Sequence, residues 1–227
     1  AGLFCAYELA LHGYRPLLVE RGRRVEERTA DVAEFWESGV LKPDSNVQFG
    51  EGGAGTFSDG KLNTMVKDPD GRGRHVLELL CKFGAPPEIL YESRPHIGTD
   101  ILTAVIRNMR EEIRRLGGRF FFQTKLIDLL VSDGRLTGVV VRTPQGSEKT
   151  IHTQTAVIAV GHSARDTFAR LHALGLVMEP KAFAVGFRVE HPQAMINECQ
   201  YGTHWEKLSL PAAPYKVTAN MPDGRGV

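Results

Sequence analysis

The middle of the chain carries the order of elements that most restricts its fold. Apolar side chains at helical spacing predict a helix over 99–116, which two glycines end. Extended segments follow at 119–124, 126–131, 136–142 and 148–153. The apolar run 156–162 then predicts a buried strand with Gly161 near its end. This order predicts an α/β fold in which a three-stranded antiparallel meander, rather than a helix, crosses between parallel strands.

The first twenty residues predict a helix–strand unit. Small and apolar residues at steps of three and four start at Gly2 and end at Gly13, and an apolar strand over 16–20 follows. This is the second half of a dinucleotide-binding fingerprint, in which the helix start faces the pyrophosphate. Ala1 and Gly2 fit that position, and Glu20 fits the acid that hydrogen-bonds the adenosine ribose. An ordinary αβ unit of a doubly wound protein has the same pattern, so this segment alone leaves both interpretations open.

Arg21 directly follows Glu20 and has two interpretations. An arginine beside the ribose acid can accommodate a 2′-phosphate. A solvent-facing arginine after a strand is the more common case, so the sequence predicts no phosphate specificity.

A glycine-rich segment spans 46–63, with glycines at 50, 52, 53, 55 and 60. Such density lets the backbone pass close to a ligand with N–H groups free to donate. Residues 55–61 match a nucleotide-hydrolysing phosphate loop, but Leu62 stands where Ser or Thr must coordinate Mg²⁺, which disfavours that activity. Phe49 and Phe57 are costly to leave in water, so a plain surface loop is also disfavoured. Binding the flexible end of a large planar cofactor is the better explanation.

Composition disfavours several classes of protein. Lys and Arg number 28 against 27 Asp and Glu, and this net charge of +1 gives no electrostatic case for nucleic acid or a membrane surface. We find no apolar run near the roughly 20 residues of a membrane span. The cysteines, at 5, 81 and 199, are too scattered for a disulfide scaffold or a zinc site, so no metal is predicted. A reducing, cytoplasmic compartment is the default.

Three long strings resemble a known family. They are SNVQFGEGGAGTFSDGKL at 45–62, RPHIGTD at 94–100 and AVGFRVEHP at 184–192, and they are similar to bacterial FAD-dependent dehydrogenases often labelled NAD(FAD)-utilising dehydrogenases. The meander crossover likewise resembles the FAD-binding domains of the glutathione-reductase-like superfamily. The resemblance implies FAD as cofactor and a dehydrogenase reaction with the flavin as redox centre. It leaves the small-molecule substrate unidentified and NAD(P)H open as the electron donor.

The resemblance also implies a domain layout. The expected parts are a Rossmann-like FAD-binding domain at 1–62 and 98–176, a helical or loop insertion at 63–97, and the start of an antiparallel substrate domain at 177–227. Strands are expected at 183–190 and 215–219. We further expect a first strand before Ala1, and a stretch after Val227 that closes over the flavin.

The residues expected to bind FAD lie at a helix start, at strand ends or in the glycine-rich segment. They are Ala1, Gly2, Glu20, Arg21, Gly53, Gly55, Thr56, Phe57, Ser58, Gly60, Lys61, Lys125, Leu126 and Gly161. Lys125 and Leu126 enter the meander, where the chain is placed to pass the adenine. Gly161 lets the backbone approach the cofactor, and 53–61 is assigned to the flavin side.

No catalytic residue is assigned. Lys61 is a candidate charge near the flavin ring. His96 and His162 are candidate acids or bases because histidine titrates near neutrality, although hydrogen bonding within a loop is the more common role for such residues. The absence of a C-x-x-C motif disfavours a dithiol relay. The alternatives are FAD-dependent tRNA modification, against which the balanced charge counts, and a non-catalytic FAD-binding protein.

Overall fold

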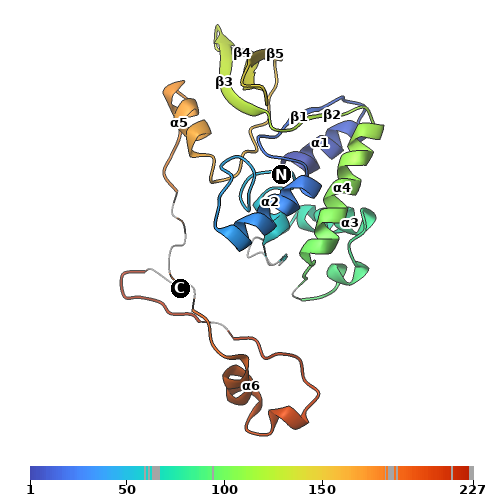
Figure 1. Cartoon of the computed structure of the whole chain (residues 1–227), viewed down its shortest axis with the longest axis vertical. Coiled ribbons are helices and arrows are strands. Elements are labelled where there is room, and N and C mark those ends of the chain that lie inside the picture. The colour runs from blue at the N-terminus through green and yellow to red at the C-terminus, as the bar shows by residue number, and fades with distance from the viewer. Residues whose placement is uncertain are drawn as a thin grey trace. The chain divides into compact units, whose positions relative to one another are not determined.

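The computed structural model describes residues 1–58, 60, 62, 67–93, 95–181, 183, 187, 189–215 and 217–224. It divides the chain into two compact units, 1–178 and 179–227. Figure 1 shows that the first unit combines a group of helices with two small sheets. In the described ranges, no helix is long and apolar enough to cross a membrane.

The predicted helix–strand unit is confirmed as α1 (Gly2–Leu11) and β1 (Leu17–Val19). Gly13 takes a left-handed φ of +81°, as glycine does at helix ends. β1 pairs in parallel with β2 (Arg119–Phe121). Beyond the strands, the Thr124 N–H donates to the Glu20 carbonyl at 2.9 Å. The residues that follow the two strands therefore lie side by side at the carboxyl edge of this sheet.

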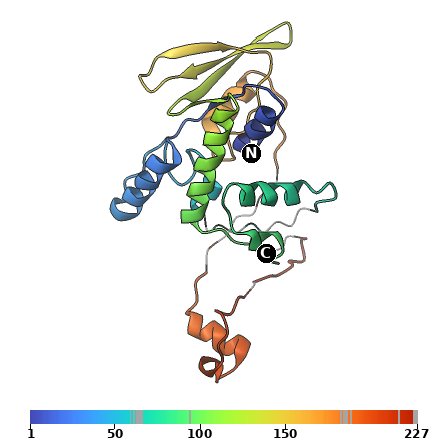
Figure 2. The same cartoon turned by 90° about the vertical axis from the view of Figure 1, so that its right-hand side faces the viewer.

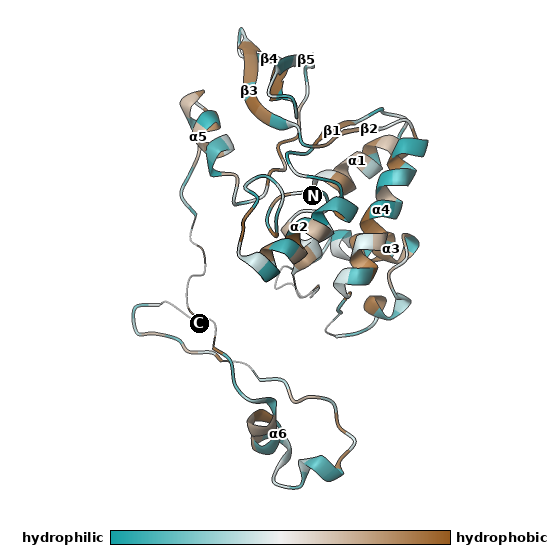
Figure 3. Cartoon of the chain, in the orientation of Figure 1, coloured by the Kyte–Doolittle hydropathy of each residue, from teal (hydrophilic) through white to brown (hydrophobic). Residues whose placement is uncertain are grey.

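The apolar core of the first unit centres on α4 (Thr99–Arg115), the predicted middle helix. Its buried apolar residues are Leu102, Val105, Ile106, Met109 and Ile113. All of them except Ile106 form one core cluster with buried residues of α1, α3 (Arg72–Lys82) and the short 3₁₀ helix η2 (Pro87–Leu90). Figure 2 shows α4 crossing α3, and Figure 3 shows the apolar side of α4. The described part of 63–97 therefore contributes to the same core as the dinucleotide-type unit.

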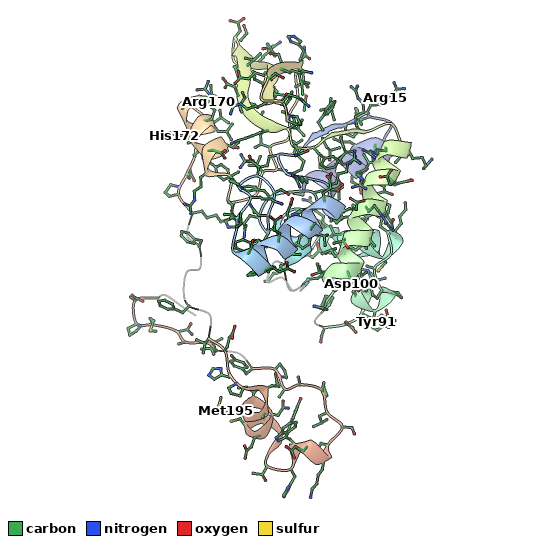
Figure 4. All side chains as sticks on the ribbon, viewed as in Figure 1. Arg15, Tyr91, Asp100, Arg170, His172 and Met195 are labelled. Carbon is green, nitrogen blue, oxygen red and sulfur yellow. The ribbon has the colours of Figure 1, made fainter. Side chains whose placement is uncertain are left out.

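The meander is confirmed as β3 (Lys125–Ser132), β4 (Arg135–Arg142) and β5 (Glu148–His152), paired antiparallel in that order. Asp133 and Gly134 both have left-handed φ values, +50° and +73°, as a two-residue hairpin turn requires. α5 (Arg165–Ala173) lies beside β3, because Arg170 makes a bidentate ion pair with Asp128 at 2.9 and 2.6 Å. Figure 4 labels Arg170 on this helix.

The buried strand predicted over 156–162 is wrong. These residues form no strand, and Val157 and Ile158 are 63% and 37% exposed. Among the described residues, no backbone hydrogen bond joins this segment to another one. An apolar run becomes a strand only where a neighbouring strand satisfies its backbone, and no described segment does so here.

The second unit contains α6 (Gln193–Tyr201) and the 3₁₀ helix η3 (Trp205–Lys207). Asn197 ties it together, because its Oδ1 accepts the Ala213 N–H at 2.9 Å. The antiparallel strands expected at 183–190 and 215–219 are absent from their described residues, and the rest of both segments lies outside the description. Phe187, one of the described residues, is fully exposed, so it lacks the packing that favours a strand.

The buried position of Met109 predicts a stability difference between two methionines of the first unit. Met109 is 0% exposed in the core, whereas Met178 is 45% exposed. Met109→Ala should lower the free energy of unfolding by roughly 2–5 kcal/mol, because it leaves a cavity among α1, α3 and α4. Met178→Ala should change it by less than about 0.5 kcal/mol. Urea unfolding measures both, and equal effects would contradict this packing.

Candidate functional site

The glycine loop, which we define as residues 46–58, lies against the turn that follows β1. A Cβ on Gly22 would lie 2.5 Å from the Cα of Gly50, so no side chain fits between them. Gly50 has a φ of +127°, and a Cβ there would meet the Cδ of Arg28 at 2.3 Å. These glycines are therefore needed for packing within the protein, which is a different reason from the ligand approach that the sequence suggested.

A single arginine holds the glycine loop from inside. Arg28 lies on α2 (Val25–Ser38) and is fully buried. Its Nε donates to the carbonyl of Asn46 at 2.8 Å, and its Nη1 donates to those of Glu51 at 2.7 Å and Gly53 at 2.9 Å. The guanidinium carbon lies 4.7 Å from the centre of the Phe57 ring. Burial lowers the pKa of Arg28 to about 10, so the side chain is charged at neutral pH.

A second ion network fixes the loop to α4. Nη1 of Arg110 and the N–H of Val25 both donate to Oε2 of Glu51, at 2.6 and 2.8 Å. Nη2 of Arg110 donates to Oε1 of Glu26 at 2.6 Å. Hydrogen bonding to Arg110 lowers the pKa of Glu26, whereas burial raises the pKa of Glu51 despite these donors. α2, α4 and the glycine loop thus share one set of charged contacts.

Glu20 lies at the carboxyl end of β1, beneath the glycine loop. Its Oε1 accepts the Gly22 N–H at 2.8 Å. Burial raises its pKa, although the Gly22 N–H and the charges of Arg28 and Arg21 act in the opposite direction. Glu20 is therefore a half-buried acid whose charged form is incompletely compensated by its surroundings.

Arg21 and Lys125 extend from neighbouring strand ends toward one carboxylate on α5. Nη2 of Arg21 donates to Oδ2 of Asp166 at 2.7 Å, and Nζ of Lys125 donates to the same oxygen. The guanidinium of Arg21 also lies 4.5 Å from the centre of the Phe49 ring. Burial alone would raise the pKa of Asp166, but the hydrogen bonds from Lys125 and Arg21 outweigh it and hold the pKa well below its usual value.

A cavity of about 160 Å³ lies between β3 and α5. Leu126 and Leu171 are among its apolar lining residues, and the pairs Lys125–Asp166 and Asp128–Arg170 border it. Pockets for a whole small molecule are about 300–1,000 Å³, so this cavity has room for one part of a larger ligand.

The segment after the apolar run also reaches the glycine loop. The Ser163 hydroxyl donates to Oε1 of Gln48 at 3.0 Å, and Nε2 of the exposed His162 lies 3.4 Å from the same hydroxyl. Gly161 has a φ of +72°, and no atom lies within 4 Å of the place of an added Cβ. A Cβ on Gly2 would make only ordinary contact with Ala159, at 3.5 Å.

The remaining predicted residues divide into open and packed positions. Gly53 and Gly55 have no atom within 4 Å of an added Cβ. Gly60 is packed, because a Cβ there would overlap the Ile97 carbonyl oxygen at 1.8 Å. The Ser58 hydroxyl bonds back within the loop, to the Gly55 carbonyl at 2.9 Å. Thr56 is buried at the 3₁₀ turn η1 (Ala54–Phe57).

The two described candidate catalytic residues, His96 and His162, lie in different segments with different neighbours. Exposed His96 lies beside Gly60, 3.5 Å from the place of an added Cβ, and His162 lies beside Ser163. Lys61 lies outside the described residues. The described ranges contain no group of three or more His, Cys, Asp or Glu side chains that could hold a metal ion.

Two central residues, Arg28 and Asp166, were missed by the sequence analysis. Arg28 carried a signal, because it falls at helical spacing with the buried Val25 and Val32. An arginine on the buried face of a helix needs acceptors from another segment. Asp166 carried none, since an acid in the first turn of a helix is common for electrostatic reasons alone.

Comparison with known proteins places most of the chain in FAD-related families. Residues 86–204, more than half of the chain, match the family described as "FAD binding domain". Residues 182–227 match the family described as "FAD-dependent protein, C-terminal domain-like". An uncharacterised protein of Clostridium beijerinckii is 50% identical over 218 residues. The match covers 96% of this chain and 40% of that protein, so the chain spans well under half of its relative's length.

Solved structures with related shapes include THI4 of Thermovibrio ammonificans. It has a TM-score of 0.48 and 20% identity, over 78% of this chain and 59% of that one. The myxobacterial chondrochloren halogenase CndH, an FAD-dependent halogenase, has a TM-score of 0.32 and 15% identity. That match covers 67% of this chain and 33% of the halogenase.

The hydrogen bonds of Arg28 predict a strong effect on stability. Arg28→Met keeps much of the side-chain volume but leaves the carbonyls of the glycine loop without their buried donor. The free energy of unfolding should fall by roughly 3–5 kcal/mol, as when one partner of a buried ionic contact is removed. Arg107→Met, at an exposed position of α4, should change it by less than about 0.5 kcal/mol. Urea unfolding at neutral pH compares the two, and a small effect at Arg28 would contradict its organising role.

Proposed function

The chain belongs to the FAD binding domain family, and we propose that it forms part of an FAD-dependent oxidoreductase, a dehydrogenase that acts on a small molecule. The family matches make FAD the cofactor. The reaction class and the NAD(P)H donor are our proposal. The substrate stays unidentified.

The observation that carries the proposal is the half-buried acid at the end of β1. Glu20 keeps a raised pKa because burial outweighs its local donors. A carboxylate in this state gains from one more hydrogen-bond donor, and a ribose hydroxyl is such a donor at the carboxyl edge of a parallel sheet. We therefore assign Glu20 to the adenosine ribose.

The glycines that the chain itself does not need also fit FAD. Gly2 and Gly55 have no left-handed φ, and a Cβ at either would meet at most an ordinary contact. Glycine is a costly choice at such positions unless another molecule approaches the backbone. Gly2 opens α1, whose first N–H groups and dipole suit a pyrophosphate. We propose that Ala1 and Gly2 hold this group, and that Gly53 and Gly55 face the flavin half.

Buried polar atoms of Arg28 and of the glycine loop support the same assignment. Among the described residues, Nη2 of Arg28, Oε1 of Glu51 and Oγ1 of Thr56 are buried without a hydrogen-bond partner. Such atoms are rare in proteins and concentrate at functional sites. The set contains a charged donor, an acceptor and a hydroxyl that can do both, which matches the mixed polar groups of a dinucleotide.

The adenine is assigned to the start of β3. Lys125 and Leu126 line the cavity between β3 and α5, and its size suits one part of the cofactor. When bound, FAD supplies the redox chemistry that amino-acid side chains lack. The described residues of this chain bind, orient and shield it, while Lys61, His96 and His162 remain candidates for the proton-handling groups.

We expect the replacement of Glu20 to have opposite effects on cofactor affinity and on stability. Glu20→Gln should weaken FAD binding about 10- to 100-fold, because a hydrogen bond to a charged group contributes about 1.5–3 kcal/mol. Without ligand, the variant should be at least as stable as the original at pH 7. The folded pKa of Glu20 lies above the ordinary glutamate value of about 4.3, so stability falls as pH rises above that value, and Gln removes this loss.

Glu112→Gln is the matched control. Hydrogen bonding to Arg115 lowers the pKa of Glu112, so this acid stabilises the fold at neutral pH and loses that contribution only in acid. Its replacement should lower stability slightly and leave FAD affinity unchanged. Fluorescence titration with FAD and thermal unfolding at several pH values provide both readouts. An unchanged FAD affinity in Glu20→Gln would remove the ribose assignment.

The proposed reaction class predicts that a nicotinamide nucleotide reduces the bound flavin. Under anaerobic conditions, NADH or NADPH should bleach the visible absorbance of the FAD-loaded protein. Photochemical reduction provides the control, since it shows that the bound flavin can cycle. Bleaching by light but by neither nucleotide would contradict the dehydrogenase proposal and favour a non-catalytic FAD protein.

A further inference from the structure

Two cations at the edge of the sheet share one carboxylate oxygen. Nη2 of Arg21 lies 2.7 Å from Oδ2 of Asp166, and Nζ of Lys125 donates to the same atom. Arg21 follows β1 and Lys125 begins β3, whereas Asp166 comes from the first turn of α5. The carboxylate therefore reaches the two cations from a separate element.

The two cations have anchors of their own. The Arg21 side chain is only 12% exposed, and its guanidinium faces the Phe49 ring at 4.5 Å. The Thr124 N–H donates to the carbonyl of Glu20, which fixes the backbone before Lys125 beside the backbone before Arg21. The pairing of the two cations thus follows from the sheet and the glycine loop.

Such a pair beside a ribose acid has the chemistry of a phosphate site. An arginine next to that acid accommodates the 2′-phosphate of phosphorylated dinucleotides. Arginine and lysine together give a dianionic phosphate two charge-assisted hydrogen bonds. The other carboxylate near Arg21, on Asp44, lies at 3.9 Å and is largely exposed. Only Asp166 makes hydrogen bonds to both cations in the described structure.

We propose that Asp166 is a specificity-determining residue whose carboxylate occupies the place of a phosphate on the adenosine ribose. The site then accepts an adenosine with free ribose hydroxyls, as in FAD, and rejects a 2′-phosphorylated one. This inference rests on the proposed assignment of Glu20 to the ribose. Removing the charge of Asp166 leaves Arg21 and Lys125 free to bind an added phosphate.

The experiment compares two nucleotides that differ only in the 2′-phosphate. Adenosine 5′-monophosphate and adenosine 2′,5′-bisphosphate are titrated calorimetrically into the protein at constant ionic strength. Asp166→Asn should shift the ratio of their dissociation constants at least about tenfold toward the bisphosphate. The affinity for the monophosphate should stay within about twofold. Arg21→Met in the Asp166→Asn background should abolish the shift.

Asp44→Asn is the matched control, because it removes the same charge near Arg21 without removing a hydrogen bond to Lys125. It should change the ratio by less than about twofold. Oδ1 of Asp166 accepts the Thr167 N–H at 2.9 Å, and the Asn amide oxygen can keep this bond. Asp166→Ser, which also retains an oxygen acceptor, replaces the Asn variant if that one unfolds.

The outcomes separate this inference from the proposed function. A ratio that does not change in Asp166→Asn, with monophosphate binding still dependent on Glu20, overturns the inference and leaves the ribose assignment standing. Equal shifts in Asp166→Asn and Asp44→Asn also overturn it, since bulk charge then explains both. Binding of neither nucleotide by any variant, together with no effect of Glu20→Gln on FAD, overturns the proposed function and the inference with it.

Discussion

The arrangement of the site depends on the buried guanidinium of Arg28. A loop rich in glycine loses much conformational entropy on folding and has few side chains with which to build a core. Its carbonyl groups nevertheless need donors when they leave water. Arg28 supplies three short hydrogen bonds from inside the protein, to Asn46, Glu51 and Gly53. The loop can then lie on the turn that holds Glu20. The positive charge of the same guanidinium also lowers the pKa of Glu20, which partly offsets the effect of burial.

The sequence predicted the elements whose pattern is local. α4 follows from its own helical spacing, and the hairpin between β3 and β4 follows from a two-residue turn that needs left-handed backbone. The segment 156–162 failed for the opposite reason. Its apolar composition predicts burial but does not identify the neighbouring strand that a strand needs for pairing. In the structure Val157 is 63% exposed.

For each contact of the candidate site, the sequence predicted one of the two residues but not its partner. Glu20, Arg21 and Lys125 follow strands, so their position at one edge could be inferred from order along the chain. Their partner Asp166 comes from a helix whose approach to β3 depends on tertiary packing. The density of glycines was visible in the sequence as well, but not which of them are needed for packing and which are open. Gly50 makes room for Arg28, while Gly55 is open, and nothing in a string of glycines distinguishes the two.

Two carboxylates at this edge are perturbed in opposite directions, and in our proposal this contrast gives the site its preference for an unphosphorylated ribose. Glu20 is partly removed from water with too little compensation, so its pKa is raised, and an incoming hydroxyl donor would stabilise its charged form. Asp166 has two cations on one oxygen, so its pKa is lowered and it needs no further donor. A neutral ribose edge therefore gains at Glu20 without disturbing Asp166. An anionic edge would have to displace Asp166 from both cations, and it would also approach the charge of Glu20.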